Sequence, residues 1–72
     1  MLDNRQLAKH LINKLVKLRF EYMDTVIGFP ATESMKTREA DALYNCFVGG
    51  QVTIDDLNEE IDRVTDDLKE IA

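Results

Sequence analysis

Three acidic side chains near the end of the sequence are of the type that binds metal ions. Asp55, Asp56 and Glu59 lie close enough along the chain to resemble an acidic Mg²⁺ cluster. On a helix, however, Asp55 and Asp56 point about 100° apart, and the sequence holds no second acidic cluster that could complete such a site. We therefore expect no metal site here.

His10 and Cys46 are the side chains that could act as a general base or a nucleophile. His10 lies among lysines with no carboxylate or serine beside it in the sequence, so we expect a surface histidine. Cys46 has neither a second cysteine nor a basic neighbour, and we expect a half-buried structural residue. Gly49 and Gly50 lack the strand and the Lys-Ser/Thr pair of a phosphate-binding loop. We predict a non-enzymatic protein without a cofactor or a small-molecule substrate.

Length and composition limit what the chain can be. It has 72 residues, 44% of them hydrophobic, with 14 acidic and 9 basic side chains. We expect a single domain, residues 1–72, whose small core depends on helix packing or on association with another chain. No apolar run approaches the roughly 18 residues that a membrane span needs, so we expect no membrane contact. The lone thiol is typical of a reducing compartment and favours a cytoplasmic location.

The first helix has clear signals at both ends. Asp3 and Gln6 have the spacing of a capping box, in which each side chain bonds the other residue's backbone. Gly28 and then Pro30 are residues that end helices. These signals predict a helix over about residues 4–27.

Two shorter helices are predicted after it. The second spans about residues 35–48 and ends at the two glycines, although its start is ambiguous because Thr32, Ser34 and Thr37 could each cap it. Thr53 and Asp56 form another capping box before a third helix over about residues 54–70. We therefore expect an all-α fold, a small three-helix bundle that is dimeric.

The dimer prediction rests on the apolar surface of the first helix. Apolar side chains cover roughly 200° of its circumference, whereas one neighbour requires about 100°. The second helix is too short to cover all of this surface, so we expect part of it to contact a second copy or a partner protein. In the alternative, a monomeric bundle covers the whole arc with its own helices. The predicted interface is a second stripe, formed by Ile12, Val16, Phe20, Met23 and Ile27.

Charge is divided unevenly along the chain. Residues 1–22 carry a net charge of +3, whereas residues 49–72 carry −6. Four acidic residues of the third helix share one face and form an acidic ridge; they are Asp55, Glu59, Asp62 and Asp66. Arg63 is placed to offset the repulsion by pairing with Glu59. The ridge is either a solvated face or a surface that selects a basic partner.

A DNA-associated dimeric regulator is the alternative function. The second and third helices have the outline of a helix-turn-helix, but the acidic third helix would face the phosphates. DNA contact would therefore depend on the basic residues of the first helix, which are Arg5, Lys9, Lys14, Lys17 and Arg19. We expect a protein partner rather than a nucleic acid.

The segment from Leu43 to Ile61, with its short helix, glycine turn and acidic helix, resembles the end of small helical antitoxins that restrain Fic-domain toxins. The inhibitory motif of that family is missing, because Ile27 rather than an acidic residue precedes Gly28. The resemblance implies a protein that neutralises another protein. Together these patterns predict a small acidic protein-binding module, such as an inhibitor, antitoxin or accessory factor of bacterial or phage type.

Overall fold

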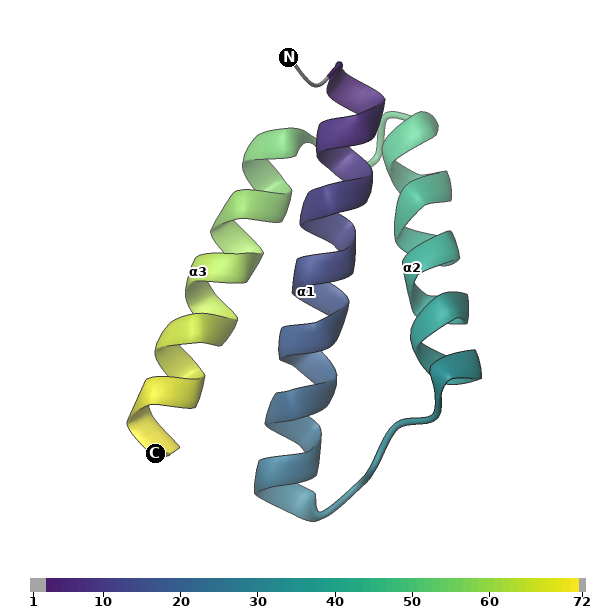
Figure 1. Cartoon of the computed structure of the whole chain (residues 1–72). Coiled ribbons are helices and arrows are strands. Elements are labelled where there is room, and N and C mark those ends of the chain that lie inside the picture. The colour runs from purple at the N-terminus through teal and green to yellow at the C-terminus, as the bar shows by residue number, and fades with distance from the viewer. Residues whose placement is uncertain (1–2, 72) are drawn as a thin grey trace.

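The computed structural model describes residues 3–71 and contains three α-helices. They are α1 (Asn4–Ile27), α2 (Glu33–Val48) and α3 (Ile54–Ile71). α2 runs antiparallel to α1, whereas α3 runs parallel to it, so α1 and α3 finish at the same end of the molecule (Figure 1). The predicted all-α, three-helix architecture is confirmed. None of the helices formed by the described residues is both long and apolar enough to span a bilayer.

The first helix begins and ends where its local signals predict. The Asp3 carboxylate accepts a hydrogen bond from the backbone N–H of Gln6 at 2.8 Å, and the Gln6 side chain accepts one from the Asp3 N–H at 3.2 Å. At the other end Gly28 has a φ of 65°, a left-handed conformation that costs glycine little. The Gly28 N–H donates to the carbonyl of Asp24 at 2.9 Å, which completes the last turn.

The other two helices begin at threonine caps. Thr32 accepts a hydrogen bond from the Met35 N–H at 3.2 Å, so α2 starts at Glu33, two residues before the predicted start. Thr53 and Asp56 form the predicted capping box, with hydrogen bonds of 3.0 and 3.1 Å. The third helix ends one residue later than predicted, at Ile71.

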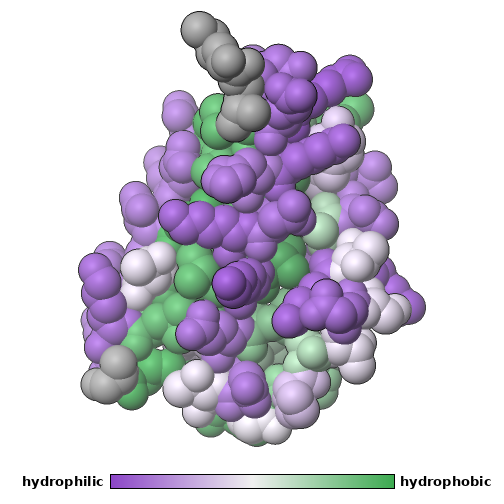
Figure 2. Space-filling view, viewed as in Figure 1, coloured by the Kyte–Doolittle hydropathy of each residue, from purple (hydrophilic) through white to green (hydrophobic). Residues whose placement is uncertain are grey.

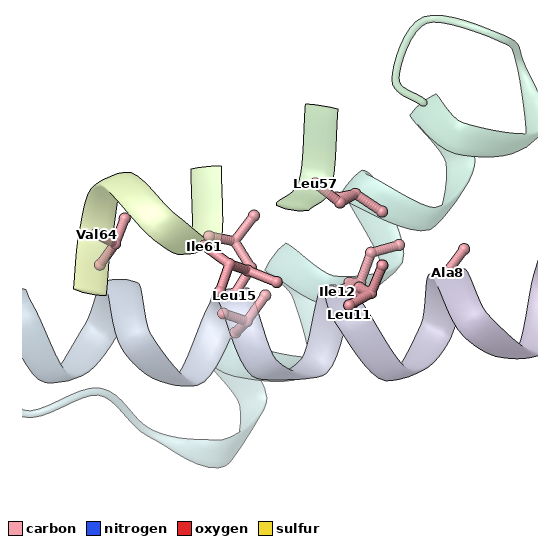
Figure 3. Packing of buried hydrophobic residues seen from close by; sticks show 8 residues of the cluster. Ala8, Leu11, Ile12, Leu15, Leu57, Ile61 and Val64 are labelled. Carbon is pink, nitrogen blue, oxygen red and sulfur yellow. The ribbon is translucent and has the colours of Figure 1, made fainter. Parts of the chain in front are cut away.

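The buried core lies between α1 and α3 (Figure 3). Within residues 3–71, all eight buried hydrophobic residues come from these two helices; they are Ala8, Leu11, Ile12, Leu15, Val16, Leu57, Ile61 and Val64. α2 supplies no buried residue and covers the core with half-buried side chains, namely Ala40, Leu43, Tyr44 and Phe47. The second helix is therefore a cover on a two-helix core.

α1 is the central helix of the bundle and packs against both neighbours, as its wide apolar arc predicts. In the described part of the chain, no Cα atom of α2 lies within 8 Å of one of α3. The radius of gyration is 12.5 Å, compared with about 11 Å for a compact domain of this length. The bundle is more open than a closed three-helix arrangement.

Candidate functional site

The side chains that could take part in chemistry do not come together in the fold. Asp56 bonds the backbone N–H of Thr53, which commits its carboxylate to helix capping. His10 is exposed on α1, and Cys46 is half-buried on α2. Within residues 3–71, no three His, Cys, Asp or Glu side chains come together as a metal site would require.

The predicted interface stripe is divided by the fold. Ile12 and Val16 are only 1% and 3% exposed, so the prediction that they contact a partner is wrong. The reason is that α2 lies over this part of α1, with Ala40 beside both residues. Phe20 and Met23 are half-buried, and Ile27 is exposed. The interface prediction stays open for the last three residues of the stripe.

Large apolar side chains are exposed where α1 and α3 end. We define the end patch as Val26, Ile27, Phe29 and Ile71, whose exposed fractions are 49%, 66%, 40% and 42%. α1 extends beyond the start of α2 at this end, so α2 does not cover its last turn (Figure 1). Among the described residues the only other exposed large hydrophobic side chain is Val48, which lies at the opposite end of the molecule.

A groove between α1 and α3 continues from the end patch. It has a volume of about 390 Å³ and is lined by Leu18, Glu21, Thr25, Thr65, Leu68, Lys69 and Ile71. Figure 2 shows hydrophobic side chains between the two helices down to this end of α3. We call this feature the α1–α3 groove. Ile71 lines this groove and is also one of the four end-patch residues.

Of the four end-patch residues only Ile27 is among the predicted interface residues; Val26, Phe29 and Ile71 are not. The spacing of apolar residues in the third helix assigns Ile71 to the core-facing seam, but Ile71 lies at the very end of α3, where α1 covers it incompletely. In the sequence, Phe29 lies between Gly28 and Pro30, the residues that end the first helix. Nothing in this context indicates that its ring is exposed. Only the turn that follows Gly28 and leads back to α2 determines its position.

No protein-family model, curated protein or solved structure matches this chain.

The acidic ridge faces solvent. Its four residues, Asp55, Glu59, Asp62 and Asp66, are all exposed, and none forms an ion pair with another described residue. Arg63 does not pair with Glu59 as predicted. It bonds Glu60 at 2.7 Å and lies 3.6 Å from Asp67. The ridge charges are left free to act on whatever approaches α3.

The basic residues of α1 are also divided. Arg5, Lys9, Lys14 and Lys17 are exposed, whereas Arg19 turns inward. The Arg19 guanidinium bonds Glu39 of α2 at 3.3 Å and Glu60 of α3 at 3.1 Å. Arg19 therefore joins the two helices that do not otherwise approach each other, and it is not free to contact DNA.

Glu60 lies at the centre of this ion-pair network. Hydrogen bonds from Arg63 and then from Arg19 lower the pKa of its carboxyl from 4.5 to about 2. A carboxyl whose pKa is lower in the folded state stabilises the fold above its unfolded pKa. This stabilisation is lost as the pH falls from about 4.5 to about 2.

We predict that Glu60→Gln lowers the free energy of unfolding at pH 7 by roughly 1 kcal/mol, a modest value because the side chain is 37% exposed. The difference from the wild type should shrink as the pH approaches 2, because the wild-type carboxyl then becomes protonated too. Thermal unfolding followed by circular dichroism between pH 7 and pH 2 measures this convergence. Glu59→Gln, one residue earlier and unpaired, is the control and should show no such loss. Parallel pH curves for Glu60→Gln and the wild type would contradict the prediction.

Proposed function

We propose that this chain is a small acidic, non-enzymatic protein-binding module that contacts another protein through the end patch. The carrying observation is the exposure of four large apolar side chains at one end of a molecule whose other surfaces are mostly polar. Several large apolar side chains exposed at one end of a small domain are typical of an interaction site. The half-buried Met23, from the predicted stripe, lies one turn before this end and would extend the contact.

The acidic ridge supports the same proposal from a different side of the molecule. Unpaired carboxylates on α3 would attract a partner with basic side chains and repel other acidic surfaces. Apolar contacts at the end patch, combined with electrostatic selection by the acidic ridge, suit an inhibitor, an antitoxin or an accessory factor of bacterial or phage type. The half-buried lone thiol of Cys46 suits a cytoplasmic setting.

The DNA-associated regulator is the second candidate. Lys9, Lys14 and Lys17 are exposed and provide the basic surface that this function needs. The engagement of Arg19 with two glutamates and the net charge of −6 on residues 49–72 weigh against it. We therefore place it behind the protein-binding function.

The test compares two aspartate substitutions of exposed aliphatic residues. Ile27→Asp lies in the end patch, whereas Val48→Asp lies at the opposite end and serves as the matched control. Proteins retained by the immobilised wild-type chain should be lost with Ile27→Asp and kept with Val48→Asp. Titration of the purified partner should show at least a tenfold loss of affinity for Ile27→Asp, as expected when a charge enters an apolar contact. Equal binding by both variants would overturn the proposal.

A further inference from the structure

The two walls of the α1–α3 groove carry opposite charges. Glu21 of α1 and Lys69 of α3 line the groove together with apolar side chains that include Leu18 and Leu68. Neither charged side chain forms an ion pair with another residue in the described part of the chain. The groove therefore combines apolar surface with one unpaired cation and one unpaired anion.

This arrangement is complementary to itself. α1 and α3 are parallel neighbours, so a two-fold axis running along the groove would set α1 of one molecule against α3 of another (Figure 1). Each Lys69 would then face the Glu21 of the second copy, and the pairing would occur twice. The same rotation would bring the apolar side chains of the two grooves together.

We propose that the α1–α3 groove, which includes Ile71 of the end patch, forms a two-fold symmetric interface with a second copy of this chain. This inference rests on the proposed function and specifies that one protein bound by the chain is a second copy of itself. It also moves the homodimer interface away from the stripe predicted from the sequence, whose first two residues are in the core, and onto the opposite flank of α1.

The exposed area of the chain agrees with such an interface. The chain exposes 5175 Å², whereas a compact monomer of 8.3 kDa exposes about 4,600 Å². The excess of about 600 Å² equals what each partner buries at the lower limit of stable interfaces. The additional exposed area is thus of the size that one interface with a second copy would bury.

Charge exchange tests the proposed pairing. The wild-type chain should sediment with twice its mass of 8.3 kDa. Glu21→Lys alone and Lys69→Glu alone should each dimerise about tenfold more weakly, because each places like charges opposite one another twice. An equimolar mixture of the two single variants should dimerise as well as the wild type, because in the mixed dimer every lysine faces a glutamate. Sedimentation velocity across a concentration series measures all four samples.

The mixture distinguishes a charge pair between two copies from a contact within one chain. If Glu21 and Lys69 stabilised only their own chain, mixing would not restore what the single variants lose, and the proposal would be overturned. Recovery in the mixture also shows that both variants are folded, and circular dichroism of each confirms it. A wild-type chain that stays at 8.3 kDa up to about 1 mM would overturn the self-association as well. In that case the proposed function stands if Ile27→Asp still loses a different partner, and falls if it loses nothing.

Discussion

Replacing Ile12 by alanine is expected to lower the free energy of unfolding by about 2–5 kcal/mol. The Ile12 side chain is 1% exposed and belongs to the core that α1 and α3 form and α2 covers, so its truncation leaves a cavity that the surrounding helices cannot fill. For a domain of 72 residues such a loss is a large part of the total stability. Urea unfolding followed by circular dichroism measures it.

Ile27→Ala is the matched control, because it removes the same atoms from the same apolar stripe. Ile27 is 66% exposed, so its truncation should change the free energy of unfolding by less than about 0.5 kcal/mol. The comparison should be made at a concentration where the chain is monomeric. Similar losses for the two variants would show that the division of the stripe between core and surface is incorrect.

Truncation of Phe47 is expected to loosen α2 while α1 and α3 keep their contact. Phe47 packs half-buried on the core and its ring lies 6.4 Å from that of Tyr44, which is itself covered by the Lys9 ammonium at 5.1 Å. Phe47→Ala should cost about 1–3 kcal/mol, less than the loss of a fully buried phenylalanine. Because α2 supplies no buried residue, the loss should fall first on its own hydrogen bonds.

Amide hydrogen exchange distinguishes local from global loosening. In Phe47→Ala the amides of α2 should exchange faster than those around Leu15 and Leu57 in the core. Val48→Ala, at the next position and 54% exposed, should leave the exchange pattern unchanged. A uniform acceleration in all three helices would mean that α2 opens only together with the core.

The helix boundaries could be predicted because they depend on neighbouring residues. The Asp3–Gln6 and Thr53–Asp56 capping boxes form between residues three apart in the sequence, and Gly28 ends α1 through its own backbone conformation. The one boundary that shifts by more than a residue is the start of α2, where three candidate caps compete within six residues. Local chemistry favours all three and does not select Thr32.

The surfaces could be predicted only in part, because they depend on contacts between distant residues. The exposure of the acidic ridge could be predicted, since the outer face of a single amphipathic helix follows from its own periodicity. Whether a residue of the apolar stripe is buried or exposed depends on where α2 lies along α1. The spacing of apolar residues within one helix does not determine that position. Arg19 shows the same limit, because its partners Glu39 and Glu60 are 20 and 41 positions away.

The placement of the core between the first and third helices has a consequence for how the chain folds. A hairpin of α1 and α2 can form from local sequence, yet it encloses no buried side chain of α2. The three buried residues of α3 are needed to complete the core, and bringing them to α1 requires closing a loop of roughly 40 residues. During synthesis the leucines and isoleucines of α1 therefore remain accessible to chaperones and proteases until the third helix has been made. The nascent chain can therefore reach its native state only after the last quarter of the sequence has been made.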